Sequence, residues 1–359
     1  MSKILSLIVP TYNMEALLRH TLDSLLVPEE KLPFLEVLVV NDGSKDSSLS
    51  IAQEYERKFA GVFFAIDKPN GNYGSCINCG LQRVTGKYVK VLDADDSFDT
   101  ENLASFLDYL TNQDVDLVIS DFSIVNESGK KEECITYDLP ESECFGFDRI
   151  PSKMCNWFFH QAITYKASLF EGLEYRQTEG ISYTDDEWTF QPMLNVKTIQ
   201  YFPKEVYLYL RGREGQTCDE KIMRRSLDQR TIVAKENVAF FEKNRTLYSQ
   251  KNFDFVFQKL LVQVAMLYNH YLSRSYSRKG IPDIIKFDSY LKETCSDVYE
   301  RLNSYSNSYG WRYIRQWRRW NYFAYCPALI IMRMKGVLYG LMGKNINALN
   351  MPMGLRRIK

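Results

Sequence analysis

The first 120 residues alternate between short apolar runs and longer segments whose apolar residues recur at helical spacing. The predicted strands are 4–9, 35–40, 62–66, a short strand that begins near 86, and 116–120. The predicted helices are 14–26, 46–59, a segment that ends near 84, and 99–112. Continuous apolar runs are typical of strands buried on both faces. Strands that alternate with helices of this length form βαβ units, so the pattern predicts an α/β fold with a mostly parallel sheet flanked by helices.

Polar residues follow four of these predicted strands. They are Thr11-Tyr12-Asn13, Asp42-Gly43-Ser44, Lys68 with Asn70, and Asp93 with Asp95. Right-handed crossovers bring the carboxyl ends of such strands to one edge of the sheet, where ligands of open α/β sheets bind. Asp93 and Asp95 project from the same side of an extended chain and can hold a hard divalent cation between them. Taken alone, the pair could also be an acidic surface turn.

The residues at this edge restrict the class of ligand. No GxGxxG follows the first strand and no GxxxxGK[ST] occurs, so the dinucleotide fingerprint and the P-loop are both missing. The edge instead offers the Tyr12 ring for a base, carboxylates for a ribose and a metal, and Lys68 for a phosphate. This set suits a nucleoside diphosphate that is carried on a divalent ion.

A resemblance to a known family rests on several motifs in a fixed order. They are Ile8-Val9-Pro10-Thr11-Tyr12-Asn13, Val39-Val40-Asn41-Asp42-Gly43-Ser44, Asn70 to Asn78, Gly86-Lys87-Tyr88 and Leu92-Asp93-Ala94-Asp95-Asp96. Together they resemble the family 2 glycosyltransferases of GT-A fold over most of residues 1–215. The resemblance implies a Rossmann-like GT-A sheet. It also implies inverting transfer of a sugar from a nucleotide donor, with Mg²⁺ or Mn²⁺ as the metal.

The same resemblance implies roles for individual residues. It sets Pro10 and Tyr12 beside the nucleobase, Asp42 on the base or ribose, Asn70 near the base, and Asp93 and Asp95 around the ribose, metal and diphosphate. One departure is plain, because many members have Ala-Arg-Asn where this chain has Cys76-Ile77-Asn78. We consider Lys68 a candidate to replace the contact of the missing arginine.

The segment around residue 185 is the candidate for the general base. Asp185, Asp186 and Glu187 precede Trp188 where a helix begins, and capping of that helix would by itself explain acidic residues here. The resemblance aligns Asp186 with the general base of the family and Asp185 with its neighbour. Removal of the acceptor proton by such a base is worth roughly 10²–10⁴ in rate. We prefer Asp186 as the base, with Asp185 second.

Two further candidates lie outside these motifs. A basic loop at 211–217 follows a predicted strand at 206–210, and it could be a solvated turn. In the resembling family such a loop closes over the donor diphosphate, which makes Arg213 the candidate to stabilise the leaving group and sets Gln216 near the acceptor. His160 lies among apolar residues, where a buried, hydrogen-bonded histidine and an acceptor contact are both open.

The C-terminal part differs from the rest in composition. We expect a catalytic domain over 1–217 and a mainly helical region over 218–359. No Asp or Glu follows Glu300, whereas 311–359 carries ten Lys or Arg, which leaves 35 basic against 45 acidic residues in 1–310. The segment 311–335 combines aromatic, apolar and basic residues, as a helix in a membrane interface does. A helix packed on the catalytic domain or on a second subunit of a homo-oligomer remains the alternative, and no nucleic-acid-binding module accompanies the basic residues.

Aromatic and basic residues of this segment fall on different faces of a predicted helix. Tyr313, Trp317 and Trp320 share one face, and Arg312, Arg315 and Arg319 share another. No apolar run approaches the 18 or so residues that a spanning helix needs. The eight cysteines are scattered and no secretory signal precedes them, so we expect reduced thiols and a cytoplasmic protein, peripheral at the inner face of the plasma membrane.

These observations lead to one functional hypothesis with two alternatives. The hypothesis is a metal-dependent inverting glycosyltransferase that moves a sugar, from a UDP-sugar in particular, to a hydroxyl of a surface polysaccharide or lipid-linked saccharide. A sugar-1-phosphate nucleotidyltransferase should instead show a Gly-rich, Arg-containing loop after the first strand, where this chain has Thr11-Tyr12-Asn13. A non-catalytic binding protein of the same fold is the second alternative.

Overall fold

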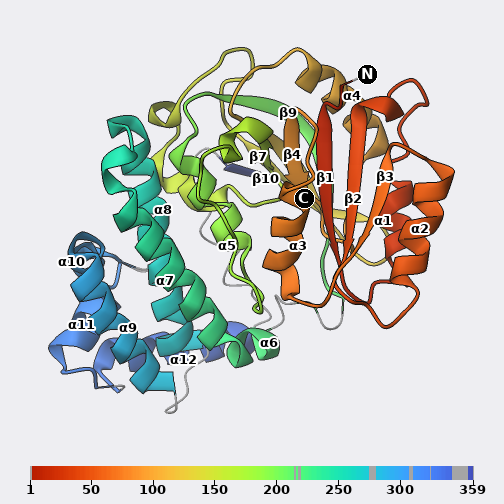
Figure 1. Ribbon diagram of the computed structural model, residues 1–359. Coiled ribbons are helices and arrows are strands. Elements are labelled where there is room, and N and C mark those ends of the chain that lie inside the picture. The colour runs from red at the N-terminus through yellow and green to blue at the C-terminus, as the bar shows by residue number, and fades with distance from the viewer. Residues whose placement is uncertain are drawn as a thin grey trace. The chain divides into compact units, whose positions relative to one another are not determined.

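The computed structural model describes residues 2–213, 216, 220–274, 280–306, 310–323, 325–341 and 355–358 (Figure 1). The chain forms two compact units. The first comprises residues 1–213 and 354–359, and the second comprises residues 214–353. The candidate residues from Pro10 to Arg213 therefore all belong to the first unit, whereas Gln216 belongs to the second.

A mixed β-sheet forms the centre of the first unit. Its strand order is β10-β7-β6-β8-β4-β1-β2-β3, and β9 pairs with both β5 and β6. The predicted strands correspond to β1 (Leu5–Thr11), β2 (Leu35–Asn41), β3 (Phe63–Asp67), β4 (Tyr88–Val91) and β6 (Leu117–Val125). Parallel pairing joins β3, β2, β1 and β4 in that order, as the alternation of strands and helices predicts. The α/β prediction is confirmed.

The helices of the first unit pack on the sheet, and side chains near the N-termini of two of them accept hydrogen bonds from backbone N–H groups of the first turn. They are α1 (Leu18–Asp23), α2 (Ser48–Lys58), α3 (Asn72–Leu81), α4 (Thr100–Thr111) and the short α5 (Asp185–Trp188). Asp99 caps α4, because its side chain accepts a hydrogen bond from the backbone N–H of Asn102 at 3.0 Å. Asp46, one residue before the N-cap of α2, accepts a hydrogen bond from the N–H of Ser48 at 3.0 Å. The predicted helix at 14–26 is longer than α1.

The other half of the sheet is where the structure adds most to the sequence pattern. Its remaining strands are β5 (Ser97–Phe98), β7 (Lys131–Tyr137), β8 (Ile163–Lys166), β9 (Ile199–Leu210) and β10 (Leu355–Ile358). Beyond β4 the pairing is antiparallel except between β6 and β9. The C-terminal β10 is a strand inside a region predicted to be helical. It obtains its hydrogen bonds from the edge strand β7, a partner that no local pattern reveals.

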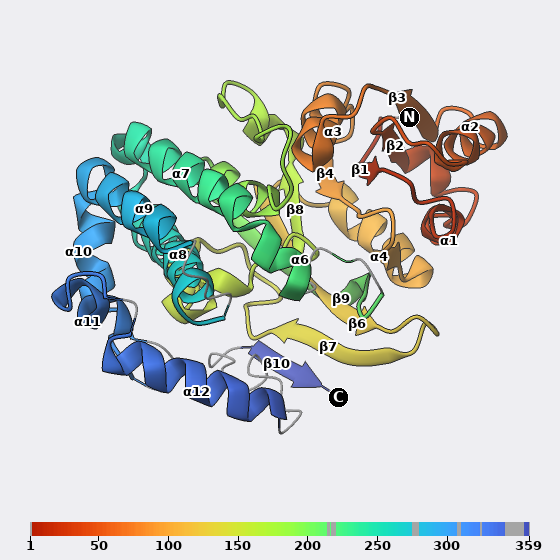
Figure 2. The ribbon, with the colours of Figure 1, turned by 90° about the horizontal axis from the view of Figure 1, so that it is seen from below.

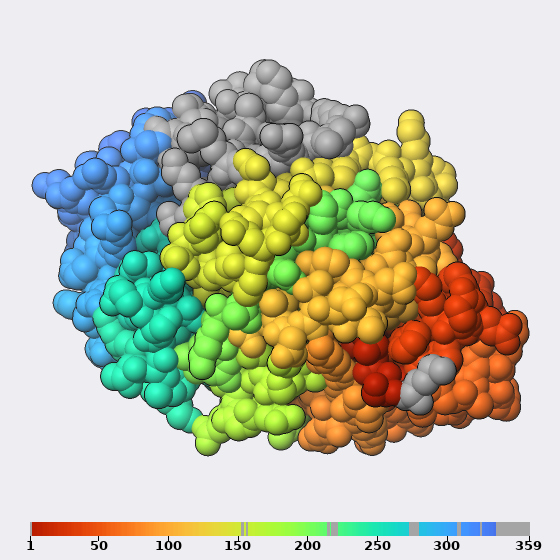
Figure 3. All heavy atoms as spheres, turned by 90° about the horizontal axis from the view of Figure 1, so that it is seen from above, coloured from red at the N-terminus to blue at the C-terminus, as the bar shows by residue number. Residues whose placement is uncertain are grey.

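In the space-filling view, the earlier residues of the first unit (red and orange) lie beside its later residues (yellow and green) on the face shown (Figure 3). β9 is longer than the predicted strand at 206–210, because it begins at Ile199, seven residues earlier. It lies parallel to β6 over nearly its whole length, from the pair Leu117–Ile199 to the pair Val125–Leu210. Its carboxyl end therefore delivers the loop with Arg213 to the same edge region as Asp95.

The second unit is helical in the part of the chain that the structure describes, apart from turns and connections. Its helices are α6 (Glu220–Arg225), α7 (Leu227–Lys243), α8 (Gln250–Asn269), α9 (Ile281–Thr294), α10 (Ser296–Ser304), α11 (Tyr313–Arg319) and α12 (Pro327–Leu341). A π-helical turn, His270–Arg274, continues α8. Figure 2 shows α7, α8 and α9 side by side. Over the described residues no helix combines the length and hydropathy that crossing a bilayer requires.

A buried ion pair joins four helices of this unit. Arg318 of α11 lies 2.6 Å from Asp288 of α9, and both side chains are almost wholly buried. Tyr268 of α8 also donates to Asp288, and the Arg318 guanidinium stacks 3.7 Å from the ring centroid of Tyr299 of α10. Because removal of one partner would leave a buried charge uncompensated, this network fixes α11 against the rest of the unit.

Candidate active site

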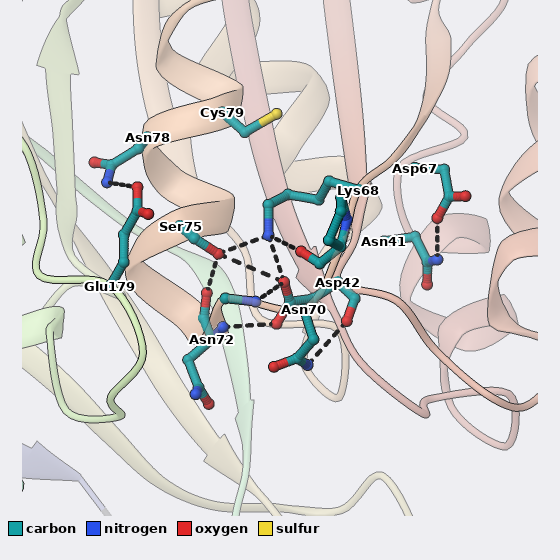
Figure 4. Close-up of polar contacts among 12 residues, drawn as sticks. Asn41, Asp42, Asp67, Lys68, Asn70, Asn72, Ser75, Asn78, Cys79 and Glu179 are labelled. Atoms are coloured by element: carbon teal, nitrogen blue, oxygen red, sulfur yellow. Dashed lines mark hydrogen bonds and ion pairs between the residues drawn. The ribbon is translucent and has the colours of Figure 1, made fainter.

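Asp42 at the end of β2 is held by the loop that follows β3 (Figure 4). Its Oδ1 accepts from Lys68 Nζ at 2.6 Å and from the N–H of Gly71 at 2.9 Å, and its Oδ2 accepts from the N–H of Asn72 at 2.9 Å. Asn70 Nδ2 donates to the backbone carbonyl of Asp42 at 2.9 Å. The loops after β2 and β3 therefore form one hydrogen-bonded structure around a buried carboxylate.

Lys68 is an anchor of this loop. Besides Asp42, its ammonium group donates to the carbonyl of Pro69 at 2.6 Å and to Ser75 Oγ at 2.8 Å, which accounts for all three N–H groups. In this arrangement Lys68 orients Asp42. Ile77, the residue at the position of the missing arginine, is completely buried in α3 and contributes to the core.

The loop after β1 is connected to the loop after β2. The N–H of Asn13 donates to Ser44 Oγ at 3.0 Å, and Asn13 Oδ1 accepts from the N–H of Lys45 at 2.8 Å. Asn13 has a left-handed backbone with φ 52°, a conformation that asparagine tolerates better than most residues. The neighbouring Tyr12 is 47% exposed, so its aromatic side chain is accessible at this edge.

Two adjacent residues connect the Asp42 loop to the acidic strand end. The N–H of Asn72 binds Asp42, and the hydroxyl of Tyr73 donates to Asp93 Oδ1 at 2.9 Å. Asn72 has a left-handed backbone with φ 64°, which lets the chain turn between these two contacts. The four polar strand ends that the sequence predicts to converge are thus joined by direct contacts from β1 round to β4.

The carboxylates of Asp93, Asp95 and Asp96 form one cluster whose oxygen atoms lie within 4.8 Å of one another. Each is also held by a different neighbour. Asp93 Oδ2 lies 3.2 Å from His160 Nε2, and Asp95 Oδ2 accepts from Arg213 at 2.7 Å. Asp96 accepts from the hydroxyl of Tyr207 at 2.6 Å and from the N–H of Leu210 at 2.8 Å.

Burial and charge act differently on the members of this cluster. Burial raises the pKa of Asp96 well above its ordinary value, and the charges of Asp93 and Asp95 raise it further. Burial alone would also raise the pKa of Asp93 and lower that of His160. Their mutual attraction reverses both effects, so the pKa of Asp93 is lowered and that of His160 is raised, as in an ion pair.

Lys90 supports the segment that carries His160. This lysine of β4 is completely buried, and its Nζ donates to the carbonyls of Gln161 at 2.6 Å and Ile163 at 3.0 Å. Burial lowers the pKa of Lys90 to about 7. Because both acceptors lie within three residues of His160, Lys90 fixes the backbone from which the imidazole reaches Asp93.

Comparison with known proteins gives the family of this site. Residues 6–160 match the family model described as glycosyl transferase family 2. These matched residues make up less than half of the chain, and over them the chain is similar to this family. The match spans all the strand-end motifs from Pro10 to Asp96, and it also includes His160.

Relatives and solved structures agree with this assignment. A glycosyltransferase of Rickettsia prowazekii is 29% identical over 227 residues, which cover 61% of this chain and 67% of the relative. The poly(ribitol-phosphate) beta-N-acetylglucosaminyltransferase TarS of Staphylococcus aureus is 25% identical over 216 residues, which cover 59% of this chain but only 36% of TarS. The crystal structure of S. aureus TarS 1-349 in complex with UDP-GlcNAc covers 96% of this chain and 93% of that one, with a TM-score of 0.64 and 18% identity. The GT-A fold is thereby confirmed.

In this glycosyltransferase, α5 presents three consecutive carboxylates in different surroundings. Glu187 is completely buried and accepts from the N–H of Thr178 at 2.7 Å and from its hydroxyl at 2.6 Å, so its role is to hold a loop. Asp185 lies close enough to Tyr73 and His160 to raise the pKa of both, after the effects of burial and of Asp93. Asp185 thus belongs electrostatically to the same cluster, and Asp186 follows it on the same half-exposed turn.

The structure of the glycosyltransferase brings together Asp93, Asp95, Arg213 and Asp185 with His160. It also brings in Asp96, which the sequence motif contains without an assigned role, and Tyr73 and Tyr207, which were not among the predicted site residues. The sequence could have indicated Tyr73 as a site residue, because it directly follows the Asn70-Gly71-Asn72 turn at the start of α3. Tyr207 had no such signal, since a tyrosine within a strand is usually a packing residue. Gln216 is buried in the second unit, and its predicted contact with an acceptor stays a prediction.

Proposed function

We propose that this glycosyltransferase transfers a sugar, with inversion, from a UDP-sugar carried on Mg²⁺ or Mn²⁺ to a hydroxyl group of a surface polysaccharide or lipid-linked saccharide. The main support is the cluster at the end of β4. There a carboxylate pair lies among charged partners that come from the loop after β9 and from the segment of His160. An acidic cluster with an arginine beside it suits a cation-bound diphosphate better than it suits a neutral ligand.

The donor set fits a divalent metal. Asp93 and Asp95 offer the hard carboxylate oxygens that Mg²⁺ and Mn²⁺ prefer, and the oxygen atoms of the cluster lie close enough to share one ion. Asp96 is almost wholly buried, and burial raises its pKa well above its ordinary value, so we assign the metal to Asp95 and Asp93 alone. When bound, the cation would supply charge neutralisation to the diphosphate of the donor.

The nucleoside would lie at the edge formed by the loops after β1, β2 and β3. Tyr12 would stack on the base beside Pro10, and Asp42 would accept hydrogen bonds from the base or ribose with Asn70 nearby. The choice of uridine draws support from a relative of the same fold, since TarS has been crystallised in complex with UDP-GlcNAc and with UDP. Lys68 would act here by orienting Asp42, through the 2.6 Å contact described above.

The transfer step needs a base and a stabilised leaving group. The acceptor oxygen attacks the anomeric carbon on the face opposite UDP while the bond to the diphosphate oxygen breaks. Asp186 takes the acceptor proton, with Asp185 as the second candidate. Arg213 stabilises the negative charge that develops on the departing diphosphate.

The acceptor class draws its support from relatives that the chain matches only in part. The poly(ribitol-phosphate) transferases of S. aureus and Bacillus spizizenii are named for a polymer acceptor, and the alignments cover 36% and 33% of their lengths. We include in the proposal a cytoplasmic location at the inner face of the plasma membrane, with peripheral contact through 311–335.

Binding and hydrolysis measurements test this function. Isothermal titration should detect UDP binding that becomes tighter when Mn²⁺ or Mg²⁺ is present. A panel of nucleotide sugars should then give slow, metal-dependent release of UDP from the true donor. UDP binding that is absent under both conditions would refute the enzyme and leave a binding protein of the same fold.

A further inference from the structure

Exposed apolar side chains are concentrated in one short segment of the helical unit. They are Trp320, Phe323, Tyr325, Ile330, Ile331 and Met334. Phe323 is 53% exposed and Met334 is 61% exposed. Elsewhere in the described part of this unit, large exposed apolar residues occur singly, at Ile232, Leu247 and Met266. We call residues 320–334 the apolar segment. Single exposed apolar residues are ordinary, whereas such a group marks a surface that binds something.

The apolar segment differs from the aromatic face that the sequence predicts. Tyr313 and Trp317 of α11 are buried, and the Tyr313 hydroxyl donates to the carbonyl of Ala265 at 3.0 Å. Only Trp320, at the end of α11, is exposed. On α12 the exposed Ile330, Ile331 and Met334 share one side of the helix, whereas Ala328 and Leu329 face the interior.

A row of exposed arginines precedes the apolar segment. Arg312, Arg315 and Arg319 lie at helical spacing on the exposed side of α11, and the inward Arg318 is neutralised by Asp288. No acidic residue occurs between Glu300 and the end of the sequence. On the neighbouring α10, Asp297 pairs with Arg245 and Glu300 accepts from Asn303, so these carboxylates have partners other than the three arginines. The exposed arginines therefore present a net positive surface.

We infer that α11, the apolar segment and the exposed side of α12 form one surface that binds an anionic lipid bilayer. The arginines would contact the headgroups, and the aromatic and aliphatic side chains would enter the boundary between headgroups and acyl chains. Charge decides between a bilayer and a second copy of the chain, because two such basic surfaces repel each other. This inference rests on the proposed function, which includes a peripheral membrane contact, and it specifies the side chains and the lipid charge of that contact.

Figure 2 shows α11 and α12 following one another along the margin of the helical unit. The two helices are in direct contact, so the exposed arginines of α11 and the apolar side chains of α12 lie on neighbouring elements. Neither attraction suffices alone, because stable anchoring of a peripheral protein usually combines an apolar insertion with a basic patch. Removal of either one should therefore weaken binding measurably.

Sedimentation of the full chain with vesicles tests the inference. The protein should sediment with vesicles of phosphatidylcholine and phosphatidylglycerol, remain in solution with phosphatidylcholine alone, and be released by added salt. Neutralising Arg315 and Arg319 to Gln should reduce the partition coefficient about fivefold for each arginine. The double change Phe323→Ser and Ile331→Ser should lower it at least as much.

Matched controls come from the same unit. Leu247→Ser removes an apolar side chain that is more exposed than Phe323 or Ile331, and Arg301→Gln removes an exposed arginine of α10. Neither change should alter partitioning. Equal sedimentation with both vesicle types, or equal effects of surface and control variants, would overturn the inference. So would self-association, measured by light scattering, that Phe323→Ser abolishes. UDP titration of the same variants tests the membrane surface and the proposed function separately. A chain that binds vesicles but not UDP would refute the proposed sugar transfer and leave the membrane inference standing.

Discussion

The guanidinium of Arg213 donates to Asp95 across 2.7 Å, so a cation from the loop after β9 already lies at the carboxylate that we assign to the metal. Both side chains are largely buried, which strengthens the attraction between them. A divalent ion that binds Asp95 must compete with this arginine. Its arrival would free Arg213 to reach the diphosphate. This ion pair thus connects metal binding by Asp95 with leaving-group stabilisation by Arg213, two roles that the sequence suggests separately.

The first prediction concerns this competition. Replacement of Arg213 by Gln should tighten the binding of Mn²⁺ to the protein without nucleotide, because Asp95 loses its competing cation. The same change should reduce kcat by roughly 10²–10³, as loss of a leaving-group contact does. Calorimetry with Mn²⁺ and single-turnover assays measure the two effects. Weaker metal binding in the variant would show that Arg213 helps to build the metal site instead.

Asp95→Asn should abolish metal-dependent turnover, since it removes one charge from the proposed ligand pair. UDP titrations with and without Mn²⁺ should then give the same affinity. Asp108→Asn, on the exposed side of α4, is the matched control and should behave like the unchanged protein. Full metal-dependent activity in Asp95→Asn would refute the metal role of this residue.

If Asp186 is the general base, its replacement should affect the transfer step and not the binding of UDP. Asp186→Asn should leave UDP binding intact and reduce transfer by roughly 10²–10⁴, the usual contribution of a general base. Asp185→Asn is the informative partner, because Asp185 is the carboxylate that acts on Tyr73 and His160. If Asp185→Asn alone produces the large loss, the order of our two candidates is reversed.

Lys68→Met should weaken UDP binding about tenfold, since a charge-assisted hydrogen bond that orients Asp42 is lost. The expected cause is disorder of Asp42 and not the loss of a phosphate contact. UMP and uridine should therefore lose affinity by the same factor as UDP, which calorimetry can compare. The control is Lys58→Met at the exposed end of α2. A loss confined to UDP would assign Lys68 to the phosphates.

Stability should depend on pH through Asp121, a buried residue of β6. Burial raises the pKa of Asp121 to about 7, although the hydroxyl of Tyr201 donates to its carboxylate at 2.7 Å. Because this folded-state pKa lies above the unfolded value of 3.8, the native state binds the extra proton in the range between them. The free energy of unfolding should therefore fall as the pH rises from about 4 to 7, by at most about 1.4 kcal/mol per pH unit.

Asp121→Asn tests this dependence by urea denaturation at pH 5 and pH 8. The variant should be stabilised relative to the original protein at pH 8 more than at pH 5, because only the ionised form is unfavourable. The exposed Asp108→Asn should show no such difference. Parallel pH profiles for Asp121→Asn and the original protein would contradict the pKa assignment.

Much of the first unit could be predicted because its information is local. The apolar runs of β1, β2 and β3 identify strands with no knowledge of their partners, and chain order then places Asp42 and Asp93 at one edge. The contacts through Asn72 and Tyr73 confirm that these strand ends meet. What the sequence left open was which neighbour would hold each carboxylate.

The amino-acid sequence by itself determined the α/β order, the acidic strand end and the segregated basic tail, because these follow from periodicity and residue type. Only the tertiary structure decided that His160 pairs with Asp93 and Arg213 with Asp95, since each pair joins residues more than 60 positions apart. It also decided that Tyr313 and Trp317 are buried while Trp320 and Phe323 are exposed. Helical spacing places side chains on a face, but only the packing of neighbouring helices determines whether that face meets the core or water.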